Sequence, residues 1–249
     1  MKILKYKKTS RGRYKLTTDS NELILYEDVI LNNNLLYNKD ITLDLLEKVL
    51  IENTYYEAYD LSLSFIEKKL RTKKEITKYL EGKGFKENII TSTIEKLENM
   101  NLLNQKTYVT AYTNDKVNLS SSGPYKIKRE LLSLGIEESI INEYMSLISN
   151  DIWKEKIKKL VKKKMTSLKD KSTYMIKNKL YVYLSNLGYD NAMINDVLSN
   201  LKVDESNSIK KEIEKAKKKY SKKYSGNDLT YHIKNYLYRK GYNVSDIEI

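Results

Sequence analysis

Lysine and arginine are the residue types of this chain whose spacing suggests chemistry. They gather in four groups: Lys68, Lys69, Arg71, Lys73 and Lys74; Lys126, Lys128 and Arg129; Lys177 and Lys179; and Lys234, Arg239 and Lys240. Basic side chains at one part of a repeated unit would line one side of an array. There they could neutralise nucleic-acid phosphates and release counterions whatever the base sequence. Two other interpretations stay open, an acidic protein groove as the partner and lysines that only solvate helix faces.

The overall charge is consistent with a polyanionic partner. The 249 residues contain 46 Lys and Arg against 33 Asp and Glu, a formal net charge of +13. Such an excess is an electrostatic footprint of nucleic-acid binding. The stretch 154–223 is the most basic, whereas 19–57 is close to neutral or acidic. Lysine outnumbers arginine, and Asn, Ile and Tyr are abundant, as AT-rich codons would give, so the excess alone does not decide the function.

Residues for catalysis or for a cofactor are scarce. His232 is the single histidine and there is no cysteine, so a His–Cys pair or a thiolate metal site cannot be built. Neither a P-loop nor a dinucleotide-binding glycine motif occurs, and Gly82-Lys83-Gly84 is typical of a helix end. Glu137 and Glu138 stand at a helix start, where they complement the helix dipole. We therefore expect no enzyme, no metal and no cofactor.

The elements that position the basic groups follow from an internal repeat. A glycine followed by an apolar residue recurs at Gly84, Gly135, Gly188 and Gly241, spaced by 51, 53 and 53 residues. Apolar residues recur eight and four positions before each glycine, and six positions after it: Ile76, Ile127, Leu180, Ile233; Leu80, Leu131, Leu184, Leu237; Ile90, Ile141, Ile194, Ile247. Such a period indicates tandem modules that stack into an extended binding surface.

Each module is expected to contain three helices. The predicted modules are 53–103, 104–150, 151–203 and 204–249, and the fourth lacks its last helix. Thr72 to Glu75 forms a capping box at the start of a helix, and the recurring glycine ends that helix in each module. Residues 120–123 predict a flexible break, with Pro124 in the first turn of the next helix.

Residues 1–52 match none of the modules. Residues 2–8 and 13–18 alternate apolar and polar types around a glycine turn at 9–12, which predicts a β-hairpin, and 21–26 could add a third strand. Helical periodicity follows over 27–36 and 40–51, with Asp40 as an N-cap. The predicted fold is mainly α, an elongated array of tandem three-helix repeats after a small N-terminal β-hairpin region.

No uninterrupted apolar run is long enough to cross a bilayer, and residues 1–8 lack the apolar core of a secretory signal. A cytoplasmic protein without a membrane partner is expected.

Two phrases resemble a known family. Residues 71–85 follow R-x-K-K-E-I-x-x-Y-L-x-x-K-G-F, and residues 122–136 follow S-G-P-x-x-I-x-x-E-L-x-x-x-G-I. Both resemble the RecX regulatory proteins, and the glycine and proline before the second helix are typical of the longer RecX proteins of low-GC Gram-positive bacteria. The resemblance extends over nearly the whole chain. It departs at Leu103-Asn104-Gln105, where the family usually has an acidic pair.

The resemblance implies a monomeric modulator of the RecA recombinase, hence a part in DNA repair, homologous recombination and the SOS response. Family members lie in the groove of the RecA–single-stranded DNA filament and oppose its ATPase, strand-exchange and coprotease activities. Binding to duplex DNA would be non-specific. Two alternatives stay open: a helical-repeat DNA-binding protein that reads duplex DNA, and a protein-interaction scaffold unrelated to RecA. The sequence does not distinguish inhibition from stimulation.

Overall fold

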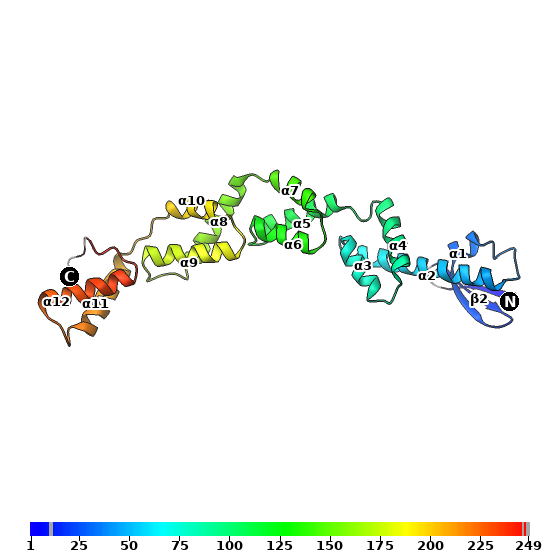
Figure 1. Cartoon of the computed structure of the whole chain (residues 1–249), viewed down its shortest axis with the longest axis horizontal. Coiled ribbons are helices and arrows are strands. Elements are labelled where there is room, and N and C mark those ends of the chain that lie inside the picture. The colour runs from blue at the N-terminus through cyan, green and yellow to red at the C-terminus, as the bar shows by residue number, and fades with distance from the viewer. Residues whose placement is uncertain (10–11, 246, 248–249) are drawn as a thin grey trace. The chain divides into compact units, whose positions relative to one another are not determined.

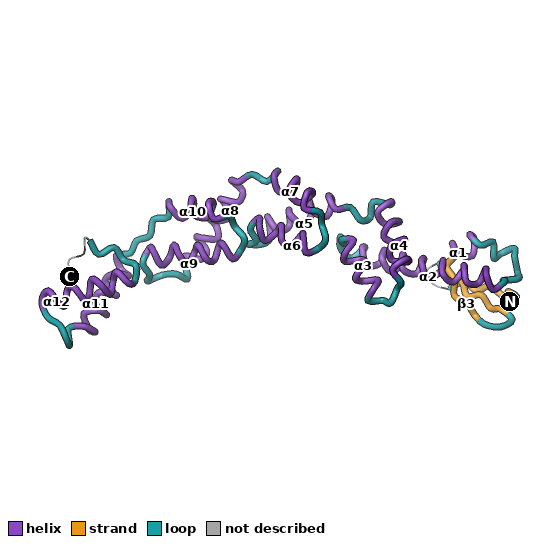
Figure 2. The backbone as a smooth tube through the Cα atoms, in the orientation of Figure 1, coloured by secondary structure: helices purple, strands orange, loops and turns teal. Residues whose placement is uncertain are grey.

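The computed structural model describes residues 1–9, 12–245 and 247. It is mainly helical, and its strands are confined to the N-terminal region (Figure 2). Two compact units are present: one contains Met1–Tyr108 with Leu134–Ile136, and the other contains Val109–Ser133 with Glu137–Ile249. The predicted fold class, helical with a small N-terminal sheet, is confirmed (Figure 1).

The sheet of the first unit has three antiparallel strands in the order β1 (Ile3–Lys8), β2 (Arg13–Thr18), β3 (Glu22–Tyr26). Tyr6 pairs with Leu16, and the register shifts between Ile3 and Lys5. The hairpin and its third strand are therefore confirmed. The predicted turn at 9–12 includes residues 10 and 11, which lie outside the described residues.

Two helices follow the sheet, α1 (Glu27–Asn32) and the long α2 (Leu43–Ile66). Asp40 is not the N-cap that we predicted. It pairs with Lys2 in an isolated β-bridge, and the Thr42 hydroxyl instead accepts from the Leu45 N–H at 3.3 Å. Because α2 runs unbroken for 24 residues, the predicted module boundary after residue 52 falls inside it.

The middle of α2 is joined to the sheet by polar contacts. Arg13 on β2 forms an ion pair with Asp60 at 3.1 Å and also contacts the Tyr26 hydroxyl. The Asn53 side chain accepts from the Tyr26 N–H at 2.9 Å. Burial, with Asp60 nearby, raises the pKa of Tyr26 to about 12, so the phenol stays neutral at physiological pH.

The C-terminal half of α2 packs with α3 (Lys73–Glu81) and α4 (Glu87–Asn99). The predicted capping box at Thr72 and Glu75 is present in both directions. Buried residues of these helices include Ala58, Ile76, Leu80, Ile90 and Leu97. Leu70 lies beyond the end of α2 and is exposed.

The remaining helices are α5 (Gln105–Leu119), α6 (Pro124–Ser133), α7 (Glu138–Ser146), α8 (Asn150–Met165), α9 (Thr173–Asn186), α10 (Asn191–Ser199), α11 (Ser206–Tyr220) and α12 (Gly226–Arg239). After Gly241 the described residues contain no helix. Helices α8, α9 and α10 pack on one another, as do α11 and α12. The division into four modules stays a prediction.

The recurring glycines end α3, α6, α9 and α12 in the same way. Gly84, Gly135, Gly188 and Gly241 have φ of 85°, 81°, 85° and 78°, a left-handed conformation that only glycine adopts without strain. The N–H of the residue after Gly188 donates to the Leu184 carbonyl at 3.3 Å, and Phe85 and Tyr242 donate in the same pattern. The eight isoleucines and leucines four and eight positions before the glycines are fully buried. The repeat is therefore a core pattern with a helix stop.

Within the second unit, the N-terminal end of one helix meets the C-terminal end of another. At α6, the N–H groups of Gly123 and Tyr125 donate to the carbonyls of Leu187 and Gly188, at the end of α9, at 2.7 and 3.0 Å. At α9, the Ser172 hydroxyl donates to the Lys240 carbonyl, at the end of α12, at 2.6 Å. At the first junction, unpaired N–H groups of one helix end thus satisfy unpaired carbonyls of the other, and at both junctions the helix dipoles meet with opposite sign. The flexible break expected at 120–123 is instead a packed junction in which Gly123 is buried.

Candidate nucleic-acid interface

Arg71, the only arginine of the first basic group, is used by the fold. Its guanidinium lies 3.5 Å from the Phe65 ring centre, its Nε donates to the Phe65 carbonyl at 3.3 Å, and its Nη1 is 3.3 Å from Glu75. The side chain is only 12% exposed. Phe65 in turn stacks on Tyr79 at 4.3 Å. Arg71 therefore fixes the turn between α2 and α3, and the lysines supply the accessible charge of this group.

The lysines of this group are exposed at the surface. Lys69 is 3.7 Å from Glu75, and Lys73 is 3.5 Å from Glu98. Exposed pairs of this kind contribute at most about 1 kcal/mol, so a phosphate could replace the carboxylate at little cost. Lys68 and Lys74 are also exposed. The turn before α3 thus presents positive charge around a rigid arginine anchor.

The second group lies on α6. Lys128 is held by Glu138 at 2.6 Å and by the Asn142 amide oxygen at 2.9 Å. Its hydrogen bond lowers the pKa of the Glu138 carboxyl. Arg129 is exposed and Lys126 is half-buried. Lys128 is therefore the member of the group that is already paired.

Lys126 and Arg129 line a polar cavity of about 510 Å³ at the junction of α6 and α9. Asp190 also lines it, but its carboxylate accepts from the Tyr125 hydroxyl at 2.9 Å and caps the first N–H groups of α10. Those hydrogen bonds lower the pKa of Asp190. Two basic side chains with hydrogen-bonding neighbours form the best candidate in this unit for a phosphate contact.

The third and fourth groups are less convergent. Lys177 donates to the Ser199 carbonyl at 3.4 Å, whereas Lys179 is exposed. In the fourth group Lys234 is half-buried and Arg239 is exposed. Lys240 lies 3.8 Å from Glu212. The basic side chains that recur in the sequence therefore differ in the structure. Some are held by a hydrogen bond or an ion pair, and others are exposed.

Two helices carry exposed lysines that we did not predict as contact residues. Lys158, Lys159, Lys162 and Lys163 are exposed on α8, and Lys217, Lys218 and Lys219 are exposed in the last turn of α11. The lysine runs in 154–164 and 210–223 were the signal that could have identified them. Lysines at a helix C-terminus are also favoured by the helix dipole.

Lys156 on α8 differs from its neighbours because it points inward. Its ammonium donates to the carbonyls of Lys116 and Val117, both at 2.8 Å, and more weakly to that of Ser122 at 3.4 Å. Burial lowers its pKa to about 8. Lys156 therefore caps the C-terminal carbonyls of α5 and is not a ligand-binding residue.

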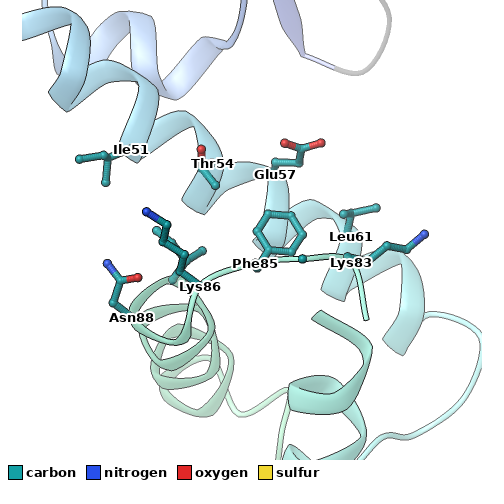
Figure 3. Close-up of a pocket in the computed structure, with 10 residues that line it drawn as sticks. Ile51, Thr54, Glu57, Leu61, Lys83, Phe85, Lys86 and Asn88 are labelled. Carbon is teal, nitrogen blue, oxygen red and sulfur yellow. The ribbon is translucent and has the colours of Figure 1, made fainter. Parts of the chain in front are cut away.

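The first unit contains at least two hollows. One of about 630 Å³ lies between α2 and the segment joining α3 to α4, where Phe85 points toward α2 (Figure 3). Its described lining has one carboxylate, Glu57, with Lys83 and Lys86 at its rim. Among the described residues no group of three His, Asp or Glu side chains could hold a metal ion. In the described part of the chain, no helix is both long and apolar enough to cross a bilayer.

The chain is similar in sequence to known proteins. Residues 58–97 match the family model described as RecX, first three-helix domain. The chain is 34% identical to the regulatory protein RecX of Streptococcus agalactiae serotype Ia, over 100% of this chain and 97% of the relative. The chain belongs to the RecX family. RecX of Bacillus cereus strain 03BB102 is 29% identical over 99% of this chain and 94% of its own length.

Solved RecX structures share the fold. A crystal structure of regulatory protein RecX aligns with a TM-score of 0.70 and 21% identity, covering 81% of this chain and all of that chain. RecX from Lactobacillus salivarius aligns with a TM-score of 0.56 and 27% identity, covering 59% of this chain and 96% of its own. The RecX assignment made from the two sequence phrases is confirmed, and with it a regulatory role.

Proposed function

We propose that this RecX-family protein binds the RecA–single-stranded DNA filament and inhibits its ATPase, strand-exchange and coprotease activities. It would act as a monomer that lies in the filament groove through its basic helical repeats. The observation that carries the proposal is the full-length similarity to RecX, combined with exposed basic side chains at the turn before α3 and on α6, α9 and α12. Such an arrangement suits a repeating polyanionic partner.

The proposed contact residues differ in how accessible their charge is. Lys68, Lys69, Lys73 and Lys74 supply accessible charge before α3, and Lys126 and Arg129 converge on the cavity at α6. Lys179, Lys234, Arg239 and the more weakly held Lys177 and Lys240 would contribute further along the chain. Arg71 and Lys128 would act mainly by holding local structure, because both are already paired.

The test is RecA ATP hydrolysis on single-stranded DNA, with and without stoichiometric amounts of the protein. We expect a fall in ATP turnover that weakens when Lys126 and Arg129 are both changed to Ala. A matched control changes Lys39 and Lys48, which are exposed lysines in the least basic part of the chain. Unchanged turnover with the wild-type protein would refute the proposal.

Two other experimental results would favour a different function for this protein. Sequence-selective duplex binding that survives raised salt would favour a DNA-binding regulator. Absence of any salt-sensitive DNA binding would favour a protein scaffold.

A further inference from the structure

The last two helices carry an aromatic cluster outside the core of that region. The core there consists of Ala216, Ile233, Leu237 and Tyr242, with partly buried residues such as Ile209 and Tyr236 packed against it. Tyr224, Tyr231 and His232 do not belong to that core. Tyr220, a further ring of the cluster, is packed against that core, so Tyr224, Tyr231 and His232 form the outer part of the cluster.

The rings of this cluster are stacked. His232 lies 3.8 Å from Tyr224 with 27° between the ring planes, and 5.7 Å from Tyr220 with 19°. Tyr231 meets His232 edge-on, at 5.6 Å and 75°. The histidine ring thus lies nearly parallel to a tyrosine of the turn after α11 and to one of α11 itself, whose own ring planes are tilted by 45°.

The two outer tyrosines of this stack are exposed to solvent, and His232 is half-buried. Tyr224 is 36% exposed and Tyr231 is 64% exposed. Helices α11 and α12 lie side by side at the C-terminal end of the chain (Figure 1). Exposed ring faces in fixed orientations are what a nucleobase needs for stacking, and every base has such a face.

Exposed lysines lie close to these rings in the sequence. Lys217, Lys218 and Lys219 occupy the last turn of α11, and Lys222 and Lys223 precede Tyr224. None of these five forms an ion pair within the described part of the chain. The Lys219 ammonium lies 5.1 Å from the Tyr220 ring centre. Positive charge beside stacked rings is the combination that tracks a phosphate backbone while holding its bases.

We propose that Tyr224, His232 and Tyr231 form a base-stacking site for single-stranded DNA, with Lys219, Lys222 and Lys223 on the adjoining phosphates. The proposal rests on the proposed function, in which single-stranded DNA is a partner, and it adds a contact to the bases themselves. Charge alone would hold the backbone but would not distinguish a strand with bases from one without.

The test measures binding of the full-length protein to two oligonucleotides without RecA. One is oligothymidylate of about 20 nucleotides, longer than a typical stacking site, and the other is an abasic strand of the same length and charge. We expect the wild-type protein to bind oligothymidylate roughly 5- to 100-fold more tightly. Tyr224→Ala and His232→Ala should largely abolish that preference.

Matched variants separate stacking from charge and from folding. Tyr238→Ala removes another exposed tyrosine of α12 and should keep the wild-type preference. Tyr224→Trp should preserve it, and its fluorescence should be quenched by oligothymidylate but not by the abasic strand, since the native Trp153 is buried. Changing both Lys222 and Lys223 to Ala should weaken binding to both strands alike and reduce the salt dependence.

Equal binding of the two strands by the wild-type protein would overturn the stacking site. So would a preference that Tyr224→Ala and His232→Ala leave intact. The RecA ATPase assay is independent of this outcome: a base preference without any effect on RecA keeps the stacking site and refutes the proposed function, and the reverse result does the opposite.

Discussion

Glycine at position 188 should be needed for two separate reasons, and substitution by alanine should expose both. Its φ of 85° is left-handed, which costs a residue with a side chain roughly 1–2 kcal/mol. A Cβ at this position would also lie 2.5 Å from the backbone nitrogen of Lys126. That nitrogen belongs to the first turn of α6 and cannot move without displacing the helix.

The second contribution follows from packing. Forcing an extra carbon into a close-packed contact costs about 1–3 kcal/mol. Relief by separating α6 from α9 would instead lose the two hydrogen bonds from Gly123 and Tyr125, each worth about 0.5–1.5 kcal/mol. We therefore expect Gly188→Ala to reduce the free energy of unfolding by about 2–5 kcal/mol in total.

Other glycines of the chain separate the two contributions. Gly84 has the same φ, but a Cβ there would meet nothing within 4 Å, so Gly84→Ala should cost only the conformational 1–2 kcal/mol, roughly. Gly123 lacks the left-handed φ, but its Cβ would lie 2.5 Å from the Gly188 carbonyl group, so Gly123→Ala reports packing alone. For Gly241 the nearest atom is Cδ1 of Tyr174, a side chain that can rotate away, so Gly241→Ala should be intermediate.

The assay is urea unfolding followed by circular dichroism and by the fluorescence of Trp153. This tryptophan is a local reporter, because it is buried and meets Tyr189, the residue after Gly188, at 6.4 Å. Gly188→Ala should shift the Trp153 transition to lower urea more than Gly123→Ala does. If Gly188→Ala and Gly84→Ala were equally destabilising to within about 0.5 kcal/mol, the junction between α6 and α9 would contribute nothing and the reasoning would fail.

Two further predictions concern charged groups. Because the folded pKa of Lys156 is lowered to about 8, the unfolded chain binds more protons above that pH, and this residue's contribution to stability should rise from pH 8 toward 9.5. Lys156→Met should lack that rise in urea unfolding measured at several pH values, and parallel curves for the two proteins would contradict the burial argument. Glu212 is buried and accepts from Lys215 at 2.6 Å and Tyr236 at 2.9 Å, contacts that lower its pKa. Its contribution should be complete above its ordinary pKa and should be lost as the pH falls below it, so Glu212→Gln should destabilise α11 and α12 by about 1–2 kcal/mol at neutral pH but much less in acid. An equal loss at both pH values would point to packing as the cause.

Much of the fold could be predicted because the local signals are strong. The glycine four residues after Leu80, Leu184 or Leu237 ends a helix in each case. Because this glycine is left-handed, the N–H of the next residue can donate to the carbonyl of the leucine. Alternation in 2–8 and 13–18 likewise requires strands. Asp40 and Thr42 show the limit: both are good N-caps by type, and only the pairing of residue 40 with Lys2 decides between them.

The candidate site was less predictable, since availability depends on tertiary contacts. Arg71 lies in one of the two sequence phrases and Arg129 in the other, yet one guanidinium is packed on Phe65 and the other is exposed. Lys156 and Lys158 are two residues apart in one lysine run, but one faces the carbonyls of α5 and the other faces solvent. Charge in a sequence gives the number of candidates, whereas burial decides which can reach a partner.

The repeat itself carries two kinds of information that the sequence does not separate. Gly84 and Gly188 are equivalent in pattern and in φ, but the start of another helix lies against Gly188, within reach of a single added carbon, and nothing lies within that reach of Gly84. Gly188 ends α9 and also leaves room for the first turn of α6. A Cβ at this position would therefore disturb both the end of α9 and the junction between the two helices. The spacing between the basic groups on α6 and α9 therefore depends on the absence of a Cβ. A variant that opened this junction should change how Lys126 and Arg129 are presented without altering any charge.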